Sequence, residues 1–204
     1  MLEPSQHLIL ASQSEARGRL LRQAGVDFEA VASFVDEEVA KASLKQQSAT
    51  GAQIAETLAE MKAKQVSLSR PDALVIGGDQ VLDCNGVLFD KPGSLDMAKA
   101  HLMALQGKRH QLHTSVCLVQ NGQRLWHYNG LVSVELIEMN EDQIAVYLNN
   151  SPKEIMQCVG CYQIEGLGAQ LFARIEGDIF TVQGLPLIEL LTQLRRMGVF
   201  NAFS

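Results

Sequence analysis

The sequence lacks the features that would place it in several specialised classes of protein. None of its apolar runs approaches the roughly 18 residues of a membrane span, and no basic segment precedes the apolar "LILA" at 8–11. We therefore expect neither a membrane partner nor a signal peptide, and a cytoplasmic location. Positive charge is also in deficit, since 17 Lys and Arg residues against 23 Asp and Glu give a net charge of −6. That charge disfavours binding to a nucleic-acid polymer, whereas a small phosphorylated ligand needs only a few local cations.

Cysteine is scarce, and its spacing gives little support for a metal or redox centre. The four residues are Cys84, Cys117, Cys158 and Cys161, which we expect to be reduced thiols. The Cys158-Val-Gly-Cys161 spacing is compatible with zinc or thiol exchange, but structural zinc would need a second close pair. The residues after Cys161 also resemble a strand rather than the helix of a redox motif. A zinc module stays the weakest of three functional alternatives, and a metal assay would decide it.

Hydrophobic patterning predicts an α/β protein of one domain, residues 1–204, either a single large domain or one with two lobes. We expect strands at 7–11, 27–35, 73–82, 109–119 and 123–138, the last two joined by an Asn121-Gly122 turn. Helices are expected at 14–24, 50–67, 94–106 and 140–148, with a last one from Pro186 to about Gly198. Residues 159–184 read as short strands separated by glycines. The adjacent long hairpin strands make an all-parallel sheet unfavourable.

The long helix at 50–67 has a recognisable apolar face. Ile54, Leu58, Met61 and Gln65 are expected on that face. Lys62 and Lys64 are then expected to project elsewhere.

The junction between the first strand and the first helix has the composition of an anion site. Ser12 and Ser14 offer hydroxyl groups beside the free N–H groups of a helix N-terminus, and Arg17 lies one turn further on. The alternative is that Ser14 is only a helix cap and the arginines form a solvated face. The Gly-Lys-Ser/Thr of a P-loop is absent.

Three further groups of charged residues could act on a phosphorylated ligand. Asp79 follows the apolar run "LVIGG", where Gly77 and Gly78 leave room for a ligand, and could bind a divalent metal or take a proton from water; alternatively it is a turn aspartate. The acidic run 36–38 could hold a hard cation or could be a solvated loop. Lys91, fixed before a proline, could neutralise phosphate.

Taken together and in order, these motifs resemble the Maf family of nucleoside triphosphate pyrophosphatases. The resemblance covers nearly the whole chain. It is carried by "LILASQSEARGRLL", "VDEE", "LAEMKA", "VIGGDQV", "KPGSLDMA", "LQGKRHQLHTSV", "GCYQIEGLG" and "EGDIFTVQGLPLIELL". No single motif is decisive, but their joint order and spacing are hard to produce by chance.

The resemblance implies an activity, a fold and a set of site residues. Such enzymes cut a nucleoside triphosphate between the α and β phosphorus atoms, releasing the monophosphate and pyrophosphate, with Mg²⁺ or Mn²⁺ as cofactor. The implied fold is the elongated, two-lobed Maf/ITPase-like structure with a mixed sheet and a central cleft, often in a homodimer. By position, the resemblance implies the following residues: Ser12, Ser14, Arg17, Lys62, Lys91 and Glu165 for substrate binding, and Asp79 and Glu37 for catalysis and metal binding.

Details of the motifs point to a branch of the family. "GDQV" and the Glu165-Gly166 pair resemble members that act on 7-methyl-GTP, whereas dTTP/UTP enzymes usually carry "ADTV" and "QG" with a preceding aspartate-lysine pair. Gln157 and Cys158 stand where that pair would be. Glu15 and Ala16 also depart from the family's usual proline and larger residue. Glu15 would weaken phosphate binding if it faced the site.

Two functional classes follow from these motifs. The first is a house-cleaning hydrolase that removes modified or surplus nucleotides, in which Asp79 activates water and Glu37 helps to hold the metal, or the reverse. The second is a nucleotide-binding regulator of cell division, or septum formation, with little turnover. The matched charged residues favour the enzyme, and the changes at positions 15 and 16 favour the regulator.

Overall fold

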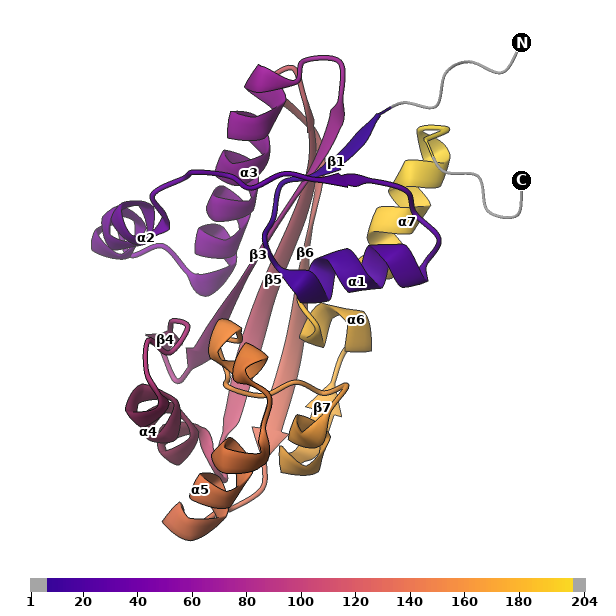
Figure 1. The fold of residues 1–204 in the computed structure, drawn as a ribbon. Coiled ribbons are helices and arrows are strands. Elements are labelled where there is room, and N and C mark those ends of the chain that lie inside the picture. Colours follow the sequence, from indigo (N-terminus) through magenta and orange to yellow (C-terminus); the bar gives the residue numbers. More distant parts are fainter. Residues whose placement is uncertain (1–6, 200–204) are drawn as a thin grey trace.

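The computed structural model describes residues 7–199. Figure 1 shows an elongated α/β arrangement in which helices gather around the two ends of a long sheet. We call the part around α1, α3 and α7 the upper lobe and the part around α4, α5 and β7 the lower lobe. None of the helices in this range is long and apolar enough to cross a bilayer.

The sheet is mixed, as the hairpin pattern predicts. Within the described range it has seven strands in the order β2-β1-β3-β5-β6-β7, and β4 pairs with the far end of β3. β1 runs parallel to β2 and β3, and the remaining pairs are antiparallel. The strands are β1 (Leu8–Leu10), β2 (Glu29–Ala30), β3 (Leu74–Cys84), β4 (Val87–Phe89), β5 (Arg109–Gln120), β6 (Gln123–Leu136) and β7 (Phe172–Glu176).

The helices begin where the sequence places good capping residues. Ser14, Thr50, Ser94 and Asn140 each accept a hydrogen bond from a backbone N–H of the first turn. The α-helices are α1 (Glu15–Gln23), α2 (Glu37–Gln46), α3 (Gly51–Ser69), α4 (Leu95–Leu105), α5 (Glu141–Asn150), α6 (Ile179–Val182) and α7 (Leu187–Arg196). Two 3₁₀ turns follow α5: η1 (Lys153–Gln157) and η2 (Leu167–Leu171).

Three local predictions are wrong. The strand expected at 27–35 shrinks to β2, because its partner β1 offers only Ile9 and Leu10 for pairing. The acidic run 36–38 does not lie in a loop: Asp36 caps α2 and the other two acids open it. Residues 159–184 contain one strand, a 3₁₀ turn and the short α6 rather than several strands.

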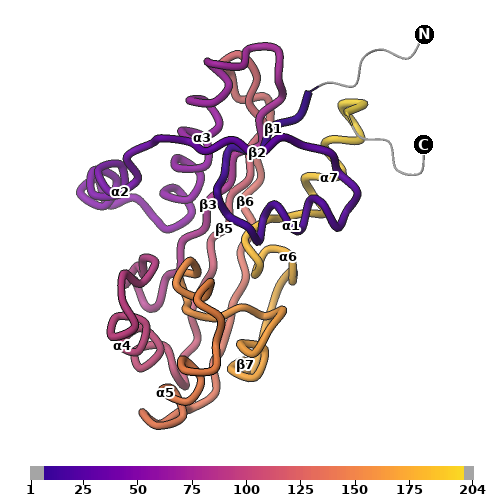
Figure 2. Tube along the Cα trace, in the orientation of Figure 1, coloured from indigo at the N-terminus to yellow at the C-terminus, as the bar shows by residue number. Residues whose placement is uncertain are grey.

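The core is divided along the length of the sheet. One apolar cluster lies between the sheet and α1 and α7, and two others lie between the sheet and α3. The lower lobe has its own large cluster, built from α4, α5, the 155–171 segment and the lower ends of β5 and β6. Figure 2 traces how β3, β5 and β6 run through both lobes.

One edge of β3 is left without a strand partner at its middle. β1 pairs with Leu74–Ile76 and β4 pairs with Leu82–Cys84, both on the side away from β5. Between these two pairings, residues 77–81 have no strand beside them on that edge within the described range. The gap lies where the two lobes meet, and it contains the "GGDQV" motif.

Helix α3 approaches this part of β3 unusually closely. A Cβ atom at Gly77 would lie 2.2 Å from the Ala59 carbonyl oxygen and 2.8 Å from Ala63 Cβ. The space that we expected a ligand to use at Gly77 is therefore filled by α3. Only glycine permits this contact, which brings the next side chains of the helix onto the gap.

Candidate functional site

The centre of the site is a buried lysine between two carboxylates. Lys62 Nζ lies 2.6 Å from Asp79 Oδ1 and 2.9 Å from Glu37 Oε1. The side chains of Lys62 and Asp79 are 7% and 8% exposed, whereas that of Glu37 is 42% exposed. Helices α2 and α3 and strand β3 thus each supply one charge.

Lys62 does not project away from the apolar face of α3 as the pattern predicts. It lies on the same i, i+4 row as Ile54 and Leu58, and all three are buried. Met61, expected on the core face, is 37% exposed. Burial of the ammonium group is tolerated because Asp79 and Glu37 compensate its charge.

Arg17 reaches the site from the face of the sheet that α1 covers, opposite to the face that α3 and Lys62 cover. Its Nε donates to the Gly184 carbonyl at 2.7 Å and its Nη1 donates to Ser12 Oγ at 3.2 Å. A Cβ atom at Gly78 would lie 3.2 Å from Arg17 Nε, so this glycine makes room for the guanidinium rather than for a ligand. Burial lowers the pKa of Arg17, and Asp79 and Glu37 act in the opposite direction. The side chain remains charged.

The two serines of the first loop have different tasks. Ser14 Oγ accepts from the Arg17 backbone N–H at 3.5 Å, so its side chain is the cap of α1. Ser12 Oγ accepts from the backbone N–H of Ser14 and from Arg17 Nη1, both at 3.2 Å. Ser12 is thereby fixed beside the guanidinium, and its own hydroxyl proton is available to a ligand.

Lys91 completes the set from the lower lobe. Partial burial lowers its pKa, and Arg17 and Lys62 lower it further, so all three cations act within electrostatic range of one another. Glu37 and Asp79 act on Lys91 in the opposite direction. Residues predicted from four motifs thus meet at the gap in β3, and Lys91, from the fifth, lies within electrostatic range of them.

The electrostatics keep Glu37 ionised. Partial burial by itself would raise the pKa of Glu37, but Lys62, Lys41 and Lys91 outweigh it and leave that pKa below its ordinary value. Lys41 was not predicted. It lies one turn after Glu37 on α2 and its ammonium group is 2.9 Å from Asp90 Oδ1, across the junction of the lobes. No helix was predicted at 37–46; such a prediction would have placed Glu37 and Lys41, four residues apart, on the same side of it.

Glu165 does not contact the cluster of Lys62, Asp79 and Glu37. Its carboxylate forms an ion pair with Arg19 of α1, across the junction of the lobes. Burial raises the pKa of the nearby Cys158 thiol, which is also influenced by Glu165, Lys91 and Arg19. The ion pair and Lys91 thus both lie within electrostatic range of Cys158.

Glu15 does not face the side of α1 that carries Arg17. Its carboxylate pairs with Arg22, and the Glu15 side chain is 76% exposed. Residues two apart on a helix point about 200° apart, so Glu15 and the buried Arg17 lie on nearly opposite sides. The acidic replacement leaves the charge around Arg17 essentially unchanged.

Two oxygen atoms at the site lack protein partners. Within residues 7–199, Asp79 Oδ2 and Ser115 Oγ are buried and make no hydrogen bond. Asp79 and Ser115 are directly opposed on β3 and β5, so their side chains share one face of the sheet. Buried polar atoms are nearly always paired, and this pair of oxygens suits a water molecule or a hard cation.

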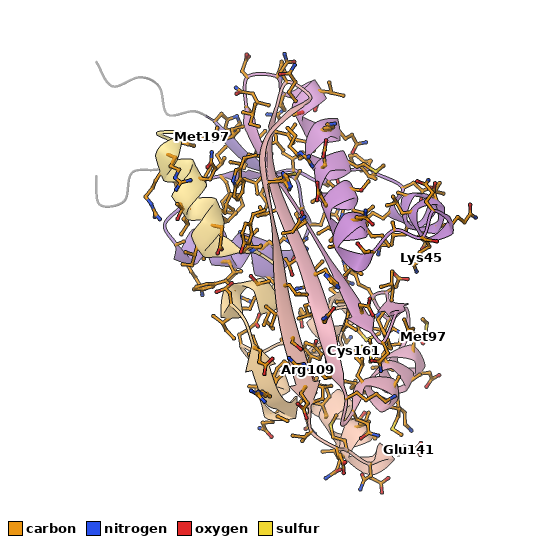
Figure 3. All side chains as sticks on the ribbon, turned by 180° about the vertical axis from the view of Figure 1, so that it is seen from behind. Lys45, Met97, Arg109, Glu141, Cys161 and Met197 are labelled. Atoms are coloured by element: carbon orange, nitrogen blue, oxygen red, sulfur yellow. The ribbon has the colours of Figure 1, made fainter. Side chains whose placement is uncertain are left out.

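The described residues contain no group of three or more His, Cys, Asp or Glu side chains arranged to hold a metal. The cysteines do not form such a site: all four are free, and burial raises the pKa of Cys161 to about 12. A thiol of that kind is a poor metal ligand and a poor nucleophile at neutral pH. Figure 3 shows Cys161 within the lower lobe.

Comparison with known proteins identifies the family. The model of the Maf-like protein family matches residues 7–197. The nucleoside triphosphate pyrophosphatase of Rhodospirillum rubrum is 48% identical over 192 residues, covering 94% of this chain and 95% of the relative. The 7-methyl-GTP pyrophosphatase of Mesorhizobium japonicum is 41% identical over 197 residues, covering 97% and 99%.

Among solved structures, a HAM1 protein from Coxiella burnetii has a TM-score of 0.46 and 15% identity, covering 93% of this chain and 98% of that one. The family assignment rests on the sequence matches, which extend over nearly all of the described residues. The chain belongs to the Maf family.

Proposed function

We propose that this protein is a nucleoside triphosphate pyrophosphatase that hydrolyses the bond between the α and β phosphates, releasing a monophosphate and pyrophosphate. The observation that carries the proposal is the convergence of Arg17, Lys62 and Lys91 with two carboxylates at the gap in β3. A polyphosphate needs several cations close together, and hydrolysis needs a group that orients water. The names of the relatives support the same reaction.

In this proposal a water molecule attacks the α-phosphorus and the bond to the bridging oxygen breaks, so that pyrophosphate leaves. Asp79 orients the water and accepts its proton at Oδ2, the oxygen without a protein partner. Arg17 and Lys91 bind the phosphate oxygens and compensate the charge that develops on the leaving group. Ser12 keeps Arg17 in place, and its hydroxyl donates a hydrogen bond to a phosphate oxygen.

A divalent metal fits the residues that are present. Glu37 has one carboxylate oxygen that does not contact Lys62 and can offer it to the metal, while Asp79 Oδ2 serves the attacking water. If the two roles are exchanged, Asp79 Oδ2 is the metal ligand instead. Mg²⁺ is usually held by one or two carboxylates together with substrate phosphates and water. When bound, Mg²⁺ or Mn²⁺ would polarise a phosphoryl oxygen.

Charge and burial distinguish the two carboxylates. A carboxylate whose pKa is lowered stays ionised, which suits Glu37 to metal binding. Asp79 is the more deeply buried of the two, so bulk water has less access to its carboxylate than to that of Glu37. These differences support Asp79 as the general base.

The nucleobase is assigned to the side of the site where Glu165 pairs with Arg19. We propose a guanine-type base, with 7-methyl-GTP as the first candidate, because a carboxylate can accept from the N–H groups on the edge of guanine. The cationic 7-methylated base would gain further from Glu165. A homodimer in the cytoplasm belongs to the same proposal.

A nucleotide panel tests the proposed function. Purified protein is assayed for pyrophosphate with 7-methyl-GTP, GTP, UTP, dTTP and CTP, each with Mg²⁺, with Mn²⁺ and with chelator. We expect release from at least one nucleotide, and only when metal is present. Tight binding of a nucleotide without release by any would favour the regulator of septum formation instead.

Three matched variants test the assigned residues. Asp79→Asn is expected to lose at least about 1,000-fold in kcat, and Glu37→Gln to weaken metal dependence of the rate. Glu38→Gln removes the neighbouring acid of α2, which is exposed, and should behave like the wild type. Wild-type pyrophosphate release by Asp79→Asn would contradict the assignment of the base.

A further inference from the structure

The position of Arg17 depends on a segment that lies far away in sequence. Its Nε donates to the carbonyl of Gly184 at 2.7 Å, and this bond joins α1 to the connection between α6 and α7. Gly184 has a φ of +101°, a backbone conformation that favours glycine. The direction of its carbonyl, and so the placement of Arg17, is set by the path of residues 181–184.

Gln80 of β3 holds that path, together with Thr114 of β5. The Gln80 side-chain amide lies 2.9 Å from the Thr181 carbonyl oxygen and 3.3 Å from the Val182 carbonyl oxygen. Because carbonyl oxygens only accept hydrogen bonds, the atom facing them is the amide nitrogen. The same nitrogen is 2.8 Å from Thr114 Oγ1, and the Thr114 hydroxyl itself donates to the Thr181 carbonyl at 3.1 Å.

Three consecutive residues of β3 thus serve one site from two faces of the sheet. Successive side chains of a strand point to opposite faces, so Gly78 and Gln80 face α1 and α6 while Asp79 faces α3. Gly78 leaves space for Arg17 and Gln80 anchors the segment that orients it. The function proposed above uses Asp79 and leaves Gln80 without a role.

We propose that Gln80 is a positioning residue, which fixes the substrate-binding guanidinium of Arg17 through the backbone carbonyl groups of residues 181–184. The inference rests on the proposed function, in which Arg17 binds the triphosphate. Gln80 itself does not touch the substrate. Its loss therefore acts through Arg17 and through no other group.

A double-mutant cycle tests this dependence. Gln80→Met keeps the length of the side chain and removes the donor. In the wild-type background it should lower kcat/KM by about 10- to 100-fold, the cost of misplacing a binding group by an ångström or less. In the Arg17→Ala background it should change kcat/KM by less than about twofold, since nothing remains to be positioned.

Ser67→Ala is the matched control. Ser67 is fully buried and joins α3 to the β5–β6 turn, accepting from the Gly122 N–H at 3.0 Å, with no path to Arg17. Its effect on kcat/KM should be the same in both backgrounds. An equal loss from Gln80→Met in both backgrounds, or no loss in either, would overturn the inference.

A second measurement does not depend on turnover. The Arg17 Nε–H proton, identified by its disappearance from the NMR spectrum of Arg17→Ala, is bonded to Gly184 and should exchange slowly with water. Exchange should become faster in Gln80→Met and stay slow in Ser67→Ala. Unchanged exchange in Gln80→Met would refute the positioning role, whereas absence of pyrophosphate release by the wild type would refute only the proposed function.

Discussion

Replacing Lys62 by methionine tests whether the site is stabilised by its buried ion pair. Methionine keeps an unbranched side chain of similar length and removes the ammonium group. Asp79 would then have no hydrogen-bond partner at either carboxylate oxygen within the described residues, because its Oδ1 contacts Lys62 and its Oδ2 is already unpaired. Its side chain would remain 8% exposed, so water could not easily replace the lysine.

The expected cost follows from this geometry. Removing one partner of a buried ion pair costs about 3–5 kcal/mol in the free energy of unfolding. Glu37 adds little to this cost because its side chain is 42% exposed and can be solvated on its own. We therefore expect a loss of about 3 kcal/mol for Lys62→Met.

A second variant separates the charge from the packing. Asp79→Asn alone should cost only about 1 kcal/mol, since Lys62 keeps its contact with Glu37. The double variant Lys62→Met/Asp79→Asn leaves no buried charge unpaired. Its loss of stability should therefore be smaller, by about 2 kcal/mol, than the sum of the losses in the two single variants. Lys64→Met, two residues along α3, removes a half-exposed lysine and its surface ion pair with Glu60, and should change stability by less than about 0.5 kcal/mol.

Urea denaturation at pH 8, with a shared slope for all variants, measures these differences. The reasoning is refuted if Lys62→Met costs less than about 1 kcal/mol, below the range for a broken buried pair. Full additivity of the two single variants would refute it as well. Lys62→Met and Asp79→Asn should both lack pyrophosphatase activity whatever their stability.

Three other predictions concern pH and salt. Burial lowers the pKa of His110 to about 4, against about 6.5 in an unfolded chain, so stability should fall by about 3 kcal/mol between pH 7 and pH 4; His110→Gln should flatten that dependence in urea denaturation. The pKa of Glu37 is lowered, so its stabilising contribution is present above the unfolded value near 4.5 and is lost as the pH falls through the folded pKa. Glu37→Gln should remove this acid-dependent loss, and an unchanged profile would contradict the assignment. Arg19→Ala frees Glu165 from its ion pair, so the preference for 7-methyl-GTP over GTP, measured as the ratio of KM values, should rise and should be reduced by added salt more than in the wild type.

The sequence predicts the elements whose signals are local. Caps at Ser14 and Asn140 and the turn at Asn121-Gly122 depend on a few adjacent residues, and the structure confirms them. The strand predicted at 27–35 failed because strand length depends on a partner, and β1 supplies only two paired residues. Helix α2 was missed because it fully buries no residue, and its apolar face is only Ala40 and Leu44, which pack partly buried beside α3.

The candidate site was predicted by residue type but not by geometry. Periodicity alone excluded Lys62 from the buried face of α3, because it cannot show that two carboxylates from other elements compensate a buried ammonium group. The glycines of "GGDQV" were expected to admit a ligand, yet Gly77 admits α3 and Gly78 admits Arg17. The sequence around a glycine does not show which distant segment will pack against it.

The balance of charge also bears on the metal that the proposed function includes. Arg17, Lys62 and Lys91 face Asp79 and Glu37, so the five groups together carry a net charge of +1. A nucleoside triphosphate brings about four negative charges at neutral pH, nearly two of them on the terminal phosphate. A divalent cation would compensate two more, which supports metal dependence on electrostatic grounds alone. Lys62 is already engaged by both carboxylates. In the proposed reaction Arg17 and Lys91 are therefore left to bind phosphate, and the proposed placement of Arg17 by Gly184 and Gln80 would be decisive.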